Sequence, residues 1–205
     1  MEESLKSCIV FPITTFGPTV VFTEIIKHQQ VYIEVNENFI KQTWRSRYVI
    51  AGANGAQTLV VPVQKANSKQ LMRDVKIDNT VPWQRNHWRS IEAAYNKSAF
   101  FEYYKDLLLP LFTDKFDLLI DYNWATLLYL HKHLQINTVL LKTIMYETDY
   151  DFDYRNFEQI KFVEPIPYNQ VFMYKRKFIP YTSALDLLFS LGPKSSQYLT
   201  NSALH

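Results

Sequence analysis

The Asn54-Gly55 dipeptide lies between two apolar, β-branched runs, 48–51 and 57–63, and it is the feature that most constrains the fold of this chain. Asparagine and glycine both tolerate the positive φ angles that a tight two-residue turn requires. Apolar runs on either side of such a turn pair as antiparallel strands. The sequence therefore predicts a β-hairpin over this region.

A strand, a helix and a second strand are predicted before the hairpin. The apolar run 8–12 ends in proline and is typical of a buried strand, 20–28 has a helical pattern, and 31–35 is rich in β-branched residues. Strands joined in this way by a helix are parallel, so the pattern predicts a βαβ unit. Ligands tend to bind beyond the carboxyl ends of such strands, where Thr14 and the segment 34–38 follow.

Helical periodicity dominates the middle of the chain. Pro82 stands near the first position of one predicted helix, Ser98 is placed to cap a second over 99–111, and 117–134 forms a third. Pro110 indicates an end or a kink in the second helix. These segments predict a helical layer that covers the N-terminal sheet.

The last third alternates between a strand, a loop and helices. The run 138–142 predicts a strand, 147–157 predicts a polar and aromatic loop, and Ser183 caps a helix that Gly192 ends. We therefore expect one α/β domain, with a small parallel or mixed sheet, an N-terminal βαβ unit and the Asn-Gly hairpin, covered by a helical layer. Its parts would be the α/β part with the hairpin (1–80), the helical layer (81–135), and a strand, loop and C-terminal helices (136–205).

The charge and cysteine content exclude several classes of protein. The 205 residues carry a net charge of +2, which argues against nucleic-acid binding because such proteins concentrate a stronger basic excess on one face. Cys8 stands alone, so an internal disulfide is excluded and a reducing compartment fits. The chain shows neither an apolar stretch of membrane-spanning length nor a signal peptide at its start. We expect a soluble, cytoplasmic protein.

Cations flank an aromatic residue just before the hairpin, at Lys41, Trp44, Arg45 and Arg47. Arginine makes bidentate contacts and lysine supplies a point charge, so this group is suited to hold a phosphate or a carboxylate. The alternative is a solvated strand edge, on which lysine prevents edge pairing.

Two further groups each have a functional and a structural interpretation. His87, one turn into a helix and beside cations, is either a general base or a structural histidine. Asp149, Asp151 and Asp153 suit a hard cation, or they belong to a capping loop in which Arg155 pairs with a neighbouring aspartate. The spacing of these acids departs from that of a calcium-binding loop. We predict no metal site, and these residues indicate no particular cofactor.

The segment 37–47, followed by Asn54-Gly55 and 59–63, resembles the WbqC-like protein family, in the branch found in Bacteroidetes-type bacteria. The likeness continues in collinear order over further segments. They include Trp83 with His87, 91–95, 100–104, 153–155, 167–172 and 183–193. The family is tied to O-antigen and surface-polysaccharide gene clusters. The resemblance implies a transferase that modifies a sugar by acyl or amino-acyl transfer to an amino sugar.

The resemblance also implies a site. Five residues are expected to line one pocket: Lys41, Arg47, His87, Tyr168 and Gln170. Within it, Lys41 and His87 would be catalytic. The substrate-binding residues would be Glu37, Trp44, Arg45, Arg47, Arg155, Tyr168 and Gln170. The donor would be a nucleotide-sugar or an acyl or aminoacyl compound. The alternative is a non-catalytic binding module in envelope or polysaccharide assembly, which contacts its partner through the loop 146–157.

The chain departs from the wider family just before Lys41. The family pattern has two aspartates where this chain has Val35 and Asn36. Glu34 and Glu37 are the nearest acids that could replace them as a base or as metal ligands.

Overall fold

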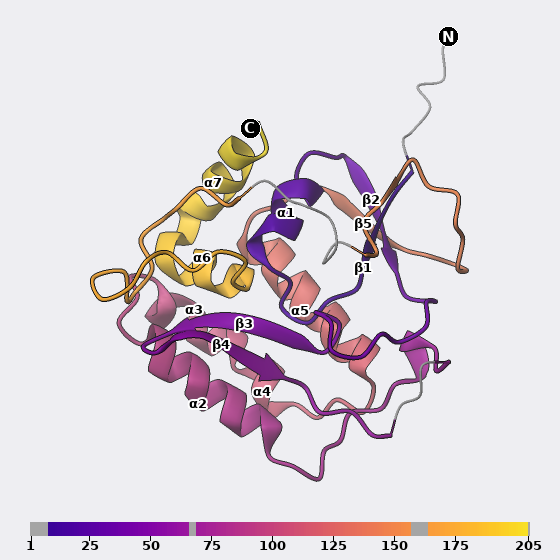
Figure 1. The fold of residues 1–205 in the computed structure, drawn as a ribbon, viewed down its shortest axis with the longest axis horizontal. Helices are drawn as coiled ribbons and strands as arrows, with labels where there is room; N and C mark the ends of the chain where they lie inside the picture. The colour runs from indigo at the N-terminus through magenta and orange to yellow at the C-terminus, as the bar shows by residue number, and fades with distance from the viewer. Residues whose placement is uncertain (1–7, 66–68, 157–163, 205) are drawn as a thin grey trace.

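Four parallel strands form the central sheet of the protein in a computed structural model that describes residues 8–65, 69–156 and 164–204 (Figure 1). Their order across the sheet is β5 (Val139–Lys142), β2 (Gln30–Glu34), β1 (Ile9–Pro12) and β6 (Phe152–Asp153). Helix α1 (Thr19–Ile25) connects β1 to β2, which pair in parallel. The predicted α/β class and the N-terminal βαβ unit are confirmed.

Strand β1 is a central strand, and its sequence reflects this position. Ile9, Val10 and Phe11 are at most 1% exposed. Because helices and loops cover both faces of a parallel sheet, a central strand is apolar without alternation. At the two edges of the sheet, Val139 of β5 and Phe152 of β6 are each 52% exposed.

The Asn-Gly hairpin is also confirmed, but it forms a sheet of its own. Strands β3 (Arg47–Gly52) and β4 (Gly55–Val60) pair in antiparallel fashion, separate from the four-stranded sheet. Gly55 has a φ of +112°, a backbone conformation that would be strained in a residue with a side chain. Helix α2 (Trp83–Tyr95) packs against the hairpin, and the hydroxyl of Tyr95 accepts a hydrogen bond from the Ala51 amide at 3.1 Å.

The remaining helices follow the predicted order with shifted ends. They are α3 (Phe101–Leu108), α4 (Pro110–Thr113), α5 (Leu119–His133), α6 (Ala184–Leu191) and α7 (Ser195–Ser202), with short 3₁₀ turns at Met72–Asp74 and Gly192–Lys194. Ser183 caps α6 as predicted, because its Oγ accepts from the Leu185 amide at 3.2 Å. The predicted cap at Ser98 is wrong. Its hydroxyl donates instead to the Tyr95 carbonyl at 2.8 Å, and Phe100 precedes α3.

Strand β6 falls inside the stretch that the sequence predicts as a loop. A strand of two residues is too short to show an alternating pattern, so periodicity cannot reveal it. Phe157, the last residue of that predicted loop, lies outside the described residues.

Phe16, just after β1, joins the hairpin and the helices in one core. Its ring packs against Tyr48 of β3, Phe112 of α4 and Tyr122 of α5, with centroids 5.0 to 6.1 Å apart. Figure 1 shows α5 crossing the middle of the molecule, between α1 and the hairpin. None of the helices in the described parts of the chain is long and apolar enough to cross a membrane.

Candidate functional site

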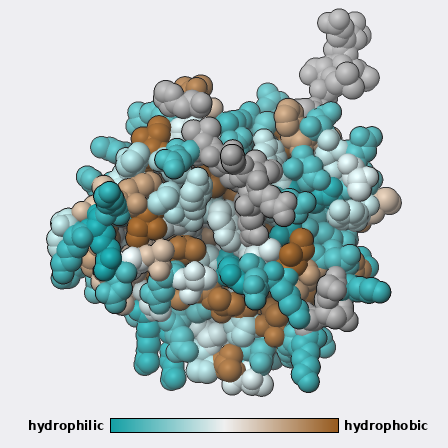
Figure 2. Space-filling view, viewed as in Figure 1, coloured by the Kyte–Doolittle hydropathy of each residue, from teal (hydrophilic) through white to brown (hydrophobic). Residues whose placement is uncertain are grey.

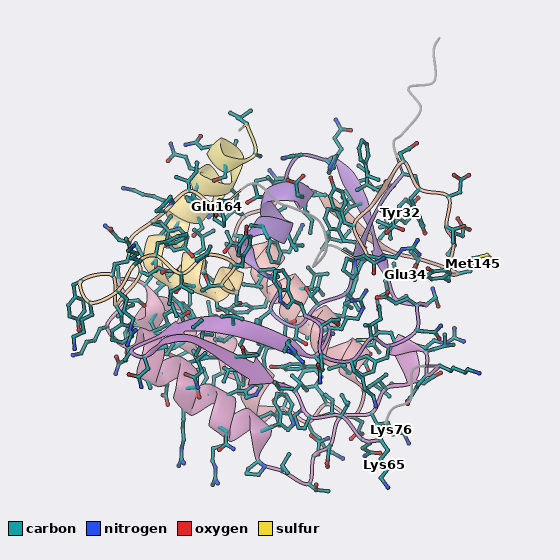
Figure 3. The ribbon with its side chains drawn as sticks, in the orientation of Figure 1. Tyr32, Glu34, Lys65, Lys76, Met145 and Glu164 are labelled. Atoms are coloured by element: carbon teal, nitrogen blue, oxygen red, sulfur yellow. The ribbon has the colours of Figure 1, made fainter. Side chains whose placement is uncertain are left out.

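The carboxyl ends of the parallel strands meet at one edge of the sheet, and a cluster of mostly buried charges lies there. Glu34 ends β2, and Figure 3 shows it beside the loop that carries Met145. We use the name ion-pair cluster for Glu34, Glu37, Arg45, Asp153 and Arg155. All but Asp153 are at most 5% exposed. Ligands of α/β proteins commonly bind at this edge.

Arg45 and Glu37 form a bidentate pair within the cluster. Arg45 Nε lies 2.7 Å from Glu37 Oε1, and Nη2 lies 2.7 Å from Oε2. Nη2 also donates to the backbone carbonyl of Arg155 at 2.8 Å. Burial raises the pKa of Glu37, and the charge-assisted hydrogen bonds from Arg45 act against that rise. The pair therefore fastens the segment after β2 to the segment after β6.

Arg155 holds the other half of the cluster together. Its Nη1 lies 3.2 Å from Glu34 Oε2, and its Nη2 lies 2.6 Å from Asp153 Oδ2. The hydrogen bonds of Asp153 raise the pKa of Arg155. Its guanidinium also stacks over the ring of Tyr146, 4.4 Å from the centroid. The pairing of Arg155 with a neighbouring aspartate, one of the two alternatives for this loop, is present.

The second oxygen of Glu34 is satisfied by neighbouring loops. Glu34 Oε1 accepts from the Thr143 hydroxyl and from the Asn36 amide, each at 2.7 Å. The Asn36 side chain in turn donates to the Thr143 carbonyl at 2.9 Å. Asn36, at one of the positions where the wider family has aspartate, thus links the ends of β2 and β5. The charged groups of the cluster thus bind one another and the neighbouring loops, so the cluster stabilises this edge of the sheet.

A crevice next to the cluster is lined by Arg47, an arginine that is not part of the cluster. Its walls are Phe16, Pro18, Trp44, Arg47, Tyr48, Val49, Tyr181 and Ser183, and the space between them has no room for a water molecule. We call it the Arg47 crevice. The Thr15 amide donates to the Trp44 carbonyl at 2.9 Å, which ties this wall to the loop after β1.

The Arg47 guanidinium carries an unsatisfied donor. Its Nε is buried and has no hydrogen-bond partner among the residues that the structure describes. A buried donor without an acceptor costs about 1–3 kcal/mol, more for a charged group, and each such case in a native protein requires an explanation. An anionic ligand at the crevice would supply the acceptor.

Backbone strain gathers at the same crevice. Phe16 has φ 42° and Tyr181 has φ 59°, and both line it. Positive φ is unusual for a bulky aromatic residue and costs on the order of 1–3 kcal/mol. Strain of this kind concentrates at functional sites, where the surrounding structure holds it in place.

His87 lies on α2, away from the ion-pair cluster. It is 5% exposed, its Nδ1 lies 3.1 Å from the Tyr48 hydroxyl, and its Nε2 lies 3.1 Å from the Val60 carbonyl. Because the carbonyl can only accept, Nε2 donates and Nδ1 accepts in the neutral ring. Burial lowers the pKa of His87 to about 4. His87 therefore reaches the Arg47 crevice only through Tyr48, whose ring is part of its wall.

Tyr168 and Gln170 meet at a third place, on a carboxylate that sequence reasoning missed. The Tyr168 hydroxyl donates to Asp186 Oδ2 at 2.6 Å, and Gln170 Nε2 donates to the same oxygen at 2.9 Å. Asp186 is fully buried and makes no ion pair within the described residues. Burial raises the pKa of Asp186. Asp186 is the third residue of α6, where acidic residues are common because they stabilise helix N-termini. Its position in the sequence therefore does not indicate that it is buried and bound by Tyr168 and Gln170.

Asp186→Asn is expected to gain stability relative to the wild type as pH rises above about 4, the pKa of an unfolded aspartate. The raised pKa means that folded Asp186 keeps a proton that the unfolded chain releases, so wild-type stability falls as pH rises. Asparagine keeps an acceptor for Tyr168 and Gln170 but does not titrate. Urea unfolding at several pH values measures the difference. Exposed Asp121, substituted in the same way, is the control, and a pH-independent difference for Asp186→Asn would contradict the expectation.

The structure thus divides the expected site among several places. Glu37, Arg45 and Arg155 meet in the ion-pair cluster, Trp44 and Arg47 line the crevice, and Tyr168 and Gln170 meet at Asp186. Lys41 is exposed on the turn before Trp44. A single pocket lined by all five expected residues stays a prediction. Tyr181, which completes the crevice, was missed because no local pattern marks it.

A metal site would need several ligand side chains close together. Among the residues that the structure describes, no group of three or more histidine, cysteine, aspartate or glutamate side chains is placed to hold a metal ion. Two of the three aspartates of the 149–153 segment bind other parts of the chain: Asp153 pairs with Arg155, and Asp151 accepts from the Cys8 amide at 2.6 Å.

The fold and this edge define an α/β protein with a buried ion-pair cluster and an arginine-lined crevice at the carboxyl ends of its strands. Comparison with known proteins gives the family. The model of the WbqC-like protein family matches residues 14–153, so the chain belongs to that family. It is also similar to a protein of Mycobacterium tuberculosis named "Uncharacterized protein Rv1507c", with 29% identity over 193 residues that cover 78% of this chain and 83% of the relative. No solved structure matches the chain.

Proposed function

We propose that this protein is a transferase that modifies a sugar in surface-polysaccharide or O-antigen biosynthesis, by moving an acyl or amino-acyl group onto an amino sugar. Membership of the WbqC-like family supports the assignment. The observation that carries it is the Arg47 guanidinium beside Trp44 and Tyr181, whose Nε is buried without a partner in the described parts of the chain. Arginine among aromatic rings suits a ligand that joins an anionic group to a ring.

Each wall of the crevice has a role in this proposal. Arg47 binds a phosphate of a nucleotide-sugar or the anionic group of an acyl or aminoacyl donor, and Trp44 and Tyr181 pack against the ring. Exposed Lys41 adds positive charge from the neighbouring turn. Because the crevice has no room for water, the partly exposed side chain of Trp44 or Tyr181 turns outward when a ligand enters.

The reaction itself is an ordinary acyl transfer. The acceptor amine attacks the activated carbonyl carbon, a C–N bond forms, and the leaving group departs with the electron pair of the broken bond. The amine must lose a proton in this step, which is general-base work. Lys41 and His87 remain the predicted catalytic residues. In support of His87, its Nδ1 lies 3.1 Å from the hydroxyl of Tyr48, a residue of the crevice wall.

Arg47→Ala is expected to weaken ligand binding by about 10- to 100-fold, because a hydrogen bond to a charged group is worth about 1.5–3 kcal/mol. Nucleotide sugars, acyl-CoAs and aminoacyl donors are first screened by thermal shift, and calorimetry then measures Kd for the best compound. Arg47→Lys keeps the charge but loses the planar fork, so it should bind with intermediate affinity. Arg85→Ala, at an exposed position on α2, is the matched control.

The proposal fails if no compound class raises the Tm of the wild type, or if Arg47→Ala binds as tightly as the wild type. Unchanged affinity in Arg85→Ala is required for either result to be interpreted.

A non-catalytic binding module in envelope or polysaccharide assembly is the second candidate. The loop after β5 favours it, because Ile144 is 93% exposed and Met145 is 59% exposed. Apolar side chains in such positions often mark contacts with a partner. Ligand binding at Arg47 without turnover of any donor and acceptor pair would support this module over the transferase.

A further inference from the structure

Two chain segments without acidic residues meet at one end of the molecule. One is 47–60, the hairpin, and the other is 165–185, which precedes and begins α6. They meet where Arg176 Nε donates to the Ala53 carbonyl of the hairpin turn, at 3.0 Å. Within these two segments, no carboxylate is present to neutralise the cations that they carry.

The loop 171–178, which we call the basic loop, projects from this end. Lys175, Arg176 and Lys177 are consecutive and exposed, and Tyr174 just before them is 74% exposed. The Lys175 ammonium lies 5.4 Å from the centre of the Tyr174 ring. Figure 1 shows the loop beyond the hairpin turn, and Figure 2 shows hydrophilic side chains gathered at that end. The loop thus presents cations and an aromatic ring together.

Gln170 holds the base of the basic loop closed. Its Oε1 accepts from the Ile179 amide at 2.8 Å, and its Nε2 donates to the Ile179 carbonyl at 3.0 Å. The same Nε2 also donates to buried Asp186. A loop that is already ordered in the free protein loses less conformational entropy when it binds.

An acidic segment lies at the opposite end of the molecule. The segment 143–154 contains Glu147, Asp149, Asp151 and Asp153 and no lysine or arginine. Figure 1 shows this segment and the basic loop at opposite ends. An anionic surface would attract one end and repel the other, so it would bind the protein in one orientation.

We propose that the basic loop docks the protein on the surface of an anionic lipid bilayer. Lys175 and Lys177 face the lipid phosphates, and the Tyr174 ring lies at the depth of the headgroups, where tyrosine is favoured in membrane interfaces. A nucleic acid offers the same phosphates. The lipid surface fits better for two reasons: exposed Tyr174 follows the half-buried apolar residues Phe172 and Met173, and the small net charge of +2 argues against a nucleic-acid partner. This surface is separate from the Arg47 crevice and does not depend on a transferase activity.

Vesicle co-sedimentation of the whole protein tests the proposal. The wild type is expected to bind vesicles of phosphatidylcholine that contain about one-third phosphatidylglycerol, and not to bind vesicles of phosphatidylcholine alone. It should dissociate at about 0.5 M salt, because salt at that concentration screens charges within a few Å. Lys175→Glu with Lys177→Glu should lower the partition coefficient by about 30-fold or more. Tyr174→Ala should lower it less. Arg176 is left unchanged because it anchors the loop to Ala53.

Lys65→Glu with Lys76→Glu makes the same change of charge far from the loop, as Figure 3 shows, and should bind like the wild type. The proposal is overturned if the wild type ignores anionic vesicles at low salt, or if both double variants lose binding equally. It is also overturned if a single-stranded oligonucleotide binds in anisotropy measurements while the vesicles do not.

Discussion

Arg45→Ala is expected to lower the free energy of unfolding by about 3–5 kcal/mol, because it leaves the buried Glu37 carboxylate without its cation. Arg45 is 2% exposed, and its guanidinium makes two 2.7 Å contacts with Glu37 and one 2.8 Å contact with the Arg155 carbonyl. Truncation removes all three contacts at once. Urea unfolding at neutral pH, with circular dichroism as the signal, measures the loss.

A double variant separates the charge from the packing. Glu37→Leu with Arg45→Met removes both charges and keeps apolar volume, so it should be clearly more stable than Arg45→Ala, since buried ion pairs often tolerate apolar replacement. Arg85→Ala on the exposed face of α2 should stay within about 0.5 kcal/mol of the wild type. If Arg45→Ala costs less than about 1 kcal/mol, the pair does not organise this edge.

The stability of the wild type should depend on His87 below neutral pH. The pKa of His87 is lowered to about 4 by burial, whereas an unfolded histidine has a pKa near 6.5. Between these values the unfolded chain binds a proton that the folded protein refuses, so the free energy of unfolding falls as pH falls. Each unit of pKa is worth 1.36 kcal/mol, which gives about 2–3 kcal/mol between pH 7.5 and 4.5.

His87→Gln isolates this contribution from other titrating groups. The stability advantage of the wild type over His87→Gln should shrink by the same amount between the two pH values, as chemical unfolding can measure. Tyr48→Phe removes the hydroxyl that bonds Nδ1 but leaves the histidine buried, so its pH dependence should persist. A constant difference between the wild type and His87→Gln would show that His87 is not buried in the neutral form.

Local signals in the sequence were sufficient where a short segment decides its own conformation. Gly55 ends the hairpin turn with a positive φ that few other residues adopt, and Ser183 caps α6 through a bond to an amide two residues away. The apolar run that became β1 needed only its continuous hydrophobicity. These features predicted the α/β class and the order of most elements.

Segments whose conformation depends on distant partners were predicted less well. Strand β6 has two residues and exists because β1 offers it a free edge, with Ile9 opposite Phe152. Serine is a common helix cap, but the hydroxyl of Ser98 donates to the Tyr95 carbonyl instead of capping α3. Short elements of this kind carry too few residues for periodicity to distinguish them.

The sequence by itself determined which residues could bind an anion, because the chemistry of a side chain does not depend on the fold. These residues are the arginines, the lysine and the tryptophan that precede the hairpin. Only the tertiary structure decided which of these cations are already neutralised. Arg45 is paired with Glu37 of its own loop and Arg155 with Glu34 at the end of β2, whereas the Nε of Arg47 is buried without a partner among the residues that the structure describes. Whether a charge is free depends on contacts between residues far apart in the chain. Those contacts follow from how β1, β2 and β6 end at the same edge.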